Sequence, residues 1–148
     1  MAEVSAFAEM LSGDHGLCVL STLRGDGSIQ SSVVNAGVMA HPRTCDPVVA
    51  LVAIGGSLKL RHLRTDPRAT VVARTGWQWV TVEGTAGIIG PDDPEPGTDA
   101  EALRLLLRAV FEAAGGTHDD WDTYDRVMRE ERRAAVLITP VRVYSNPG

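Results

Sequence analysis

The chain has 148 residues, of which 44% are hydrophobic and 22% are charged, and its formal net charge is −5. This composition suits one globular domain and excludes an intrinsically disordered chain. No apolar run approaches the roughly 20 residues that cross a bilayer, and the negative charge disfavours general nucleic-acid binding.

The first half of the chain predicts a short helix followed by three strands. Residues 3–12 place apolar side chains at helical spacing, and residues 17–23 are typical of a buried strand. Asp26-Gly27 tolerates the positive φ of a tight hairpin, so residues 29–39 should return as a second strand. The β-branched run 48–54 predicts the third.

A helix and two strands should follow. Gly55-Gly56 interrupts the third strand, and the next residues have helical spacing up to Asp66-Pro67, where the residue before proline avoids the α region. Strands are expected over 69–75 and 77–90, and the second is long enough to bend at Gly84 or Gly87.

The last third predicts two helices and a closing strand. Thr98 and Glu101 have capping-box spacing and would open a helix that runs to about residue 114. A second helix is expected over 119–133 and a final strand over 135–145. Six strands with hairpin-length connections and late helices indicate an α+β fold built on an antiparallel barrel, with residues 1–148 forming one domain.

The start of the chain and its cysteines predict a cytoplasmic protein. The first 16 residues lack the basic start and the apolar core of a secretory signal. Cys18 lies in an apolar run, where a buried thiol is expected, and Cys45 lies in a polar loop. We therefore expect no disulfide.

Basic residues concentrate in one segment of this acidic chain. Residues 55–75 contain five cations against the single acid Asp66: Lys59, Arg61, Arg64, Arg68 and Arg74. Such a cluster favours an anionic small molecule over a long polyanion, with a solvated basic surface as the alternative.

Most familiar catalytic motifs are absent. The four histidines are scattered without metal-ligand spacing, and neither GxSxG nor a glycine-rich nucleotide loop occurs. What remains is a predicted helix start at Ser57, with Lys59 and Arg61 in its first turn. Backbone amides at a helix N-terminus favour anions, so a phosphate could accept bonds from these amides and all three side chains.

Two tryptophans lie near the start of the fifth predicted strand. Trp77 and Trp79 flank Gln78, and alternation along a strand would place both indoles on one face. They would stack on a planar ring, fill a dimer interface, or pack in the core. Trp121 has helical spacing with Tyr124 and Met128, which indicates core packing.

The order of these segments resembles a known superfamily. The sequence around Gly25-Asp26-Gly27, the stretches SLKLRHLRTDPR and WVTVEG, and the late helix with its closing strand resemble the pyridoxamine-phosphate-oxidase-like flavin-binding split β-barrels. Within them, the chain is most similar to the actinobacterial F420-dependent oxidoreductases, over roughly residues 5–145. The resemblance implies a six-stranded antiparallel split barrel, with flanking helices, that forms a homodimer with cofactor sites at the subunit interface.

The resemblance also implies which residues hold the cofactor. The ring and its linker would be lined by Ser31, Ser32, Val33, Val34, Asn35, Ala36, Val52 and Ala53. The phosphate would be held by Ser57, Lys59 and Arg61. The partner subunit would contribute Trp77, Gln78, Trp79 and Val80.

Two departures from the family bear on the cofactor. Flavin-mononucleotide (FMN) oxidases of this type carry basic residues near Ser31 and Leu58, which are both uncharged here. Lys59 and Arg61 instead fit the deazaflavin branch, in which reduced coenzyme F420 donates a hydride to a conjugated small molecule. The alternatives are an FMN enzyme, and a non-catalytic protein that carries a cofactor, haem or another planar ligand. Arg64 and Arg68 would either attract the polyglutamate tail of F420 or remain solvated. The role of His62 stays open.

Overall fold

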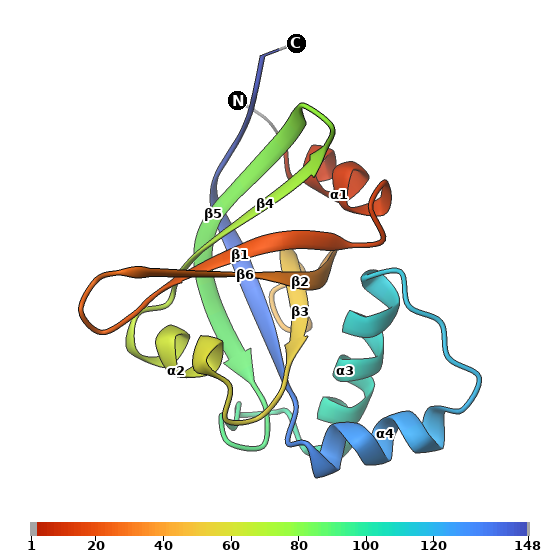
Figure 1. Ribbon diagram of the computed structural model, residues 1–148. Coiled ribbons are helices and arrows are strands. Elements are labelled where there is room, and N and C mark those ends of the chain that lie inside the picture. Colours follow the sequence, from red (N-terminus) through yellow and green to blue (C-terminus); the bar gives the residue numbers. More distant parts are fainter. Residues whose placement is uncertain (1–2, 148) are drawn as a thin grey trace.

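Six strands make a closed antiparallel barrel in the computed structural model, which describes residues 3–147, and the order around the barrel is β1-β2-β3-β6-β5-β4. Four helices flank it (Figure 1). In chain order the elements are α1 (Val4–Ser12), β1 (Leu17–Leu23), β2 (Ile29–Ala40), β3 (Pro47–Ala53), α2 (Leu58–Thr65), β4 (Arg68–Thr75), β5 (Gln78–Ile89), α3 (Ala100–Ala113), α4 (Trp121–Glu130) and β6 (Ala134–Ser145). The predicted fold class and element order are confirmed.

The turn and bend signals lie where local chemistry predicted them. Gly27 has a φ of 85°, and the Asp26 carboxylate accepts bonds from the amide and hydroxyl of Ser28. The β1–β2 hairpin that it closes extends well beyond the barrel (Figure 1). The β5–β6 register shifts at Glu83/Gly84, where a Cβ on Gly84 would lie 2.3 Å from the Thr139 carbonyl oxygen.

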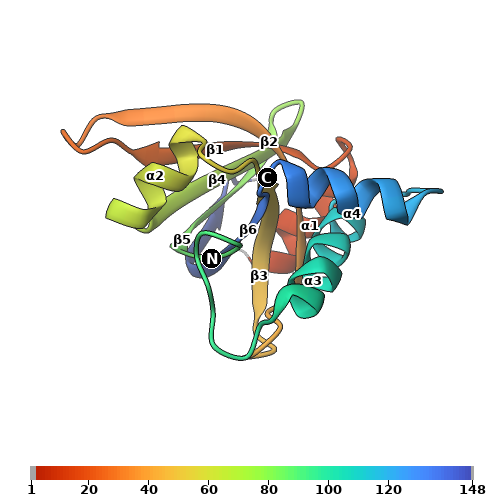
Figure 2. The same cartoon turned by 90° about the horizontal axis from the view of Figure 1, so that it is seen from below.

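Two of the helices complete the core inside the barrel. Phe7 and Leu11 of α1 and Leu60 and Leu63 of α2 are buried in the same cluster as the inward-facing strand residues. These two helices lie at different ends of the barrel (Figures 1 and 2). The packing of α2 against the strands fixes the position of its N-terminus.

Helix α3 covers the outer face of β3 and β6 with Leu106, Leu107 and Val110. Its N-cap is Asp99, whose carboxylate accepts a bond from the Ala102 amide at 2.8 Å. The predicted cap at Thr98 is therefore wrong by one residue. Asp99, the next residue, accepts the bond from the Ala102 amide instead, because a carboxylate caps a helix as well as a hydroxyl does.

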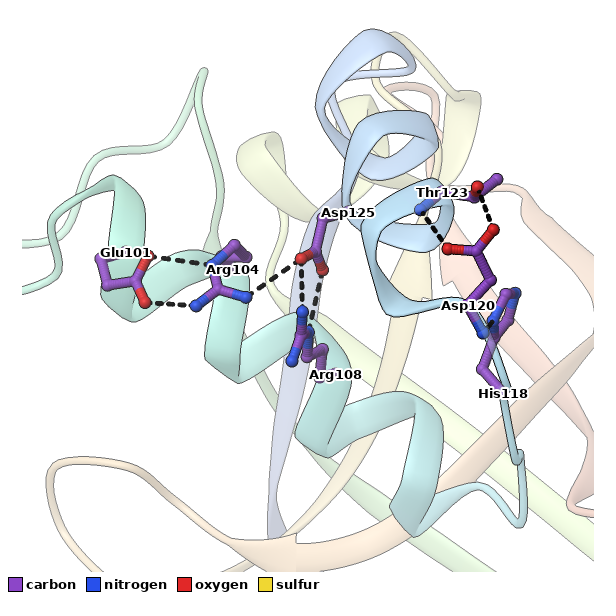
Figure 3. Close-up of polar contacts among 7 residues, drawn as sticks. All are labelled: Glu101, Arg104, Arg108, His118, Asp120, Thr123 and Asp125. Atoms are coloured by element: carbon purple, nitrogen blue, oxygen red, sulfur yellow. Dashed lines mark hydrogen bonds and ion pairs between the residues drawn. The ribbon is translucent and has the colours of Figure 1, made fainter.

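An ion-pair network fastens α4 to α3 (Figure 3). Asp125 accepts bonds from Arg104 at 3.0 Å and from Arg108 at 2.6 and 3.0 Å, and Arg104 also pairs with Glu101. The bonds from Arg108, followed by those from Arg104, lower the pKa of Asp125. No helix within residues 3–147 is long and apolar enough to cross a membrane.

Candidate functional site

The N-terminus of α2 contains a buried hydroxyl without a partner. Ser57 is the N-cap residue in an extended conformation, yet its side chain makes no capping bond. Its Oγ is buried and has no hydrogen-bond partner among residues 3–147. The first amides of a helix also lack acceptors within the helix. Several unused donors therefore gather at this point, which suits an anion.

The structure divides the predicted basic cluster into paired and available cations. Arg64 forms a bidentate pair with Asp93 at 2.8 and 2.5 Å, and Arg68 pairs with Asp66. Lys59 and Arg61 form no ion pair within the described range 3–147. Arg74, at the end of β4, also forms no ion pair within this range and donates to the Gly76 carbonyl. Two of the three available cations of the cluster therefore lie in the first turn of α2, close in sequence to Ser57.

A pocket of about 380 Å³ adjoins this helix start. Its walls come from β2, from the end of β3, from Lys59 and from the α3–α4 hairpin. Its lining residues are Val33, Val34, Asn35, Val52, Lys59, Val110, Phe111, Ala114, Tyr124, Met128 and Arg133. This lining is mostly apolar and aromatic, and it includes two cations but no carboxylate. We call it the helix pocket.

A smaller pocket of about 180 Å³ lies between α2 and the inner sides of β1 and β2. Ser32 and Lys59 line it, so Lys59 borders both pockets. His62 anchors the helix above it, because its Nδ1 lies 3.0 Å from the hydroxyl of buried Thr22. The role of His62, which the sequence did not assign, is therefore to tie α2 to β1.

Five of the eight predicted ring-binding residues line one of the two pockets, and three do not. Val33, Val34, Asn35 and Val52 line the helix pocket, and Ser32 lines the smaller one. The remaining three lie elsewhere. Ala36 and Ala53 are buried in the core. Ser31 is exposed and shares a hydrogen bond with Ser21 at 2.8 Å.

The predicted aromatic pair does not share an environment. Trp77 lies in the turn before β5 and is 92% exposed, whereas Trp79 is half-buried and packs edge-on against Tyr144, with 6.1 Å between ring centroids. Gln78 is exposed and Val80 is buried. None of these four residues lines either pocket. The β4–β5 turn lies beside α1, away from α2 (Figure 1).

Known structures share this barrel. A haem-binding protein from Mycobacterium smegmatis has a TM-score of 0.64 at 19% identity, over 100% of this chain and 55% of that chain. A pyridoxamine 5'-phosphate oxidase-related, FMN-binding protein from Nostoc punctiforme has 0.62 at 14%, over 98% and 84%. An F420 reductase has 0.58 at 13%, over 86% and 88%. The chain folds as a split barrel of this type. At sequence identities this low, the structural similarity establishes the fold alone.

No protein-family model matches the sequence, and a comparison with curated proteins finds no match either.

The α3–α4 wall of the pocket was not predicted as part of a site. Phe111, Tyr124, Met128 and Arg133 all line the pocket. Tyr124 donates to the Leu107 carbonyl at 3.0 Å, and burial raises its pKa to about 12, so it is a neutral structural phenol. Helical spacing in the sequence shows that a face is buried, but it does not distinguish a core from a pocket wall.

The close approach of α3 to β2 depends on Gly37. A Cβ there would lie 2.2 Å from the carbonyl carbon and oxygen of Ala113. Asn35 strengthens the contact, because its amide donates to the carbonyls of His15 at 2.8 Å and Ala114 at 3.3 Å. Asn35 therefore holds the pocket wall in place, in addition to lining it.

Proposed function

We propose that this split barrel is an oxidoreductase that binds reduced coenzyme F420 and transfers its hydride to a conjugated small molecule. The observation that carries the proposal is the unpartnered Ser57 hydroxyl at the start of α2, with Lys59 and Arg61 in the same helical turn. Of these three residues, Lys59 lines the largely apolar helix pocket. A phosphate would satisfy the hydroxyl, and the pocket suits a planar ring.

The chain's own residues would bind and orient the cofactor. Ser57, Lys59 and Arg61 hold the phosphate, and Val33 and Val52 contact the ring. The bound deazaflavin supplies the hydride. Little other chemistry is available in the core, because burial raises the pKa of the Cys18 thiol to about 12 and keeps it protonated.

Two uncharged residues support F420 over FMN. The family resemblance implies that FMN oxidases of this type carry cations near Ser31 and Leu58, which are both uncharged here. Leu58 is 51% exposed at the first turn of α2, so an uncharged residue faces outward there. Lys59 and Arg61 supply the positive charge of the first turn of α2.

Replacing Lys59 tests the site. Lys59→Ala removes a charge-assisted contact of about 1.5–3 kcal/mol, so the Kd for F420 should rise by roughly 10- to 150-fold. Arg126→Ala, on an exposed part of α4, is the matched control and should leave the Kd unchanged. An unchanged Kd in a folded Lys59→Ala variant would remove Lys59 from the site.

We also propose a homodimer in which the partner completes the site. An exposed apolar surface on β1 and β2 supports it, with Leu17, Val19, Ile29 and Val33 between 39% and 67% exposed. The partner would bring Trp77, Gln78, Trp79 and Val80 to the cofactor.

Val19→Asp tests the dimer, because it places a charge among apolar residues. Val19 is paired with Val33 on β2 and with Val72 on β4. Analytical ultracentrifugation should show a monomer with weakened F420 binding. A wild-type chain that sediments as a monomer and still binds F420 tightly would contradict the dimer.

A further inference from the structure

Arg133 contributes a second cation to the helix pocket. It lies just before β6 and lines the pocket together with Phe111, Tyr124 and Met128. Among the lining residues the only other cation is Lys59, which the proposed function assigns to the cofactor phosphate. The cation at Arg133 is therefore left without a role in that function.

One edge of the Arg133 guanidinium is fixed and the other is available. Nε and Nη2 contact a single oxygen of Glu131, at 2.9 and 2.7 Å. Nη1 has no hydrogen-bond partner within residues 3–147. Anchoring by Glu131 reduces the entropy lost when the guanidinium binds a ligand. The geometry of a guanidinium allows the Nη1/Nη2 edge to receive a carboxylate through two parallel bonds.

The rest of the pocket restricts the chemistry of the ligand. No carboxylate lines the helix pocket itself; among residues 3–147 the carboxylate paired with Arg133 is that of Glu131, and it leaves Nη1 unused. The adjoining pocket between α3 and α4, which shares Met128 and Arg133, is lined by acids as well as arginines, Glu101 and Asp125 among them. The aromatic and aliphatic walls favour a flat, apolar body.

We propose that the hydride acceptor is a planar, conjugated carboxylic acid, whose carboxylate binds Arg133 while its ring packs against Phe111 and Met128. This inference rests on the proposed function for the hydride source. The alkene of the acceptor gains a hydride at the carbon β to the carbonyl group that activates it and a proton from water at the carbon α to that carbonyl. Bound reduced deazaflavin would supply this hydride and with it both electrons of the reduction.

A matched acid and ester test the proposal by binding. Isothermal titration of the protein with 3-benzoylpropionate and with its methyl ester compares ligands that differ in the charge of one group. The acid should bind at least about tenfold more tightly than the ester, as expected for a charge-assisted pair. Arg133→Gln should abolish this preference, Arg133→Lys should keep part of it, and Arg129→Gln should leave it unchanged.

Turnover gives a second measurement. With reduced F420, trans-3-benzoylacrylate should have a KM at least about tenfold below that of its methyl ester in the wild type, and Arg133→Gln should remove the difference. Equal binding of acid and ester to the wild type would overturn the proposal, and this comparison needs no variant to fold.

Measuring F420 binding distinguishes a failure of the acceptor proposal from a failure of the proposed function. If Arg133→Gln weakens F420 binding as much as acid binding, Arg133 belongs to the cofactor site and the acceptor proposal fails. If F420 does not bind the wild type at all, the proposed function fails, while the acid preference still reports on Arg133.

Discussion

Replacing Ser57 by alanine should change stability and ligand binding in opposite directions. The Ser57 hydroxyl is buried, unpartnered and makes no capping bond, so the free protein loses no hydrogen bond when it is removed. A buried hydroxyl without a partner costs roughly 1–3 kcal/mol. If alanine recovers about 1 kcal/mol of that cost, Tm should rise by roughly 2–4 °C in a chain of this size.

The same substitution should weaken binding of the cofactor. A hydrogen bond from Ser57 to a phosphate contributes about 1.5–3 kcal/mol, so the Kd for F420 should rise by roughly 10- to 150-fold. Differential scanning calorimetry without ligand and tryptophan quenching with F420 measure the two effects. Ser12→Ala, at an exposed serine at the end of α1, is the control. A lower Tm together with an unchanged Kd would refute the argument that this hydroxyl is reserved for a ligand.

Two further predictions concern the pocket wall. Asp125→Asn should destabilise the protein by about 2 kcal/mol in urea unfolding at pH 7, because three bonds to arginine are weakened. Because the pKa of Asp125 is lowered in the folded protein, its carboxylate stabilises the protein fully above the unfolded pKa, and this stabilisation is lost as pH falls below about 4. If the difference in unfolding free energy between variant and wild type were as large at pH 3 as at pH 7, this reasoning would be wrong. Gly37→Ala should cost roughly 1–3 kcal/mol through its clash with Ala113, and should also disturb ligand binding in the helix pocket; unchanged stability would show that α3 moves freely.

Local signals in the sequence predicted the elements because each depends on neighbouring residues. The Asp26-Gly27 turn, the β-branched third strand and the stop at Asp66-Pro67 are set by backbone preferences within a few residues. The closed barrel was predicted from short connections and from the family resemblance. The cap of α3 was misplaced by one residue because Thr98 and Asp99 are both good caps.

The site was harder to predict because its walls meet through long-range contacts. Arg64 looked available in the sequence, but Asp93 neutralises it from a loop 29 residues away. Phe111 and Arg133 have no local signal that assigns them to a pocket, since β2 and β3 supply the opposite wall. The partner role of Trp77 and Trp79 remains a prediction that depends on the dimer.

The most direct test of the central claim is a titration of the purified protein with F420 and, separately, with FMN, followed by tryptophan quenching. We predict tight binding of F420 and much weaker binding of FMN, with the Kd for F420 raised by roughly 10- to 150-fold in Lys59→Ala. A preference for FMN would contradict the assignment of the deazaflavin and favour the oxidase alternative. Binding of neither would contradict the phosphate site at Ser57 and leave the carrier or haem alternative.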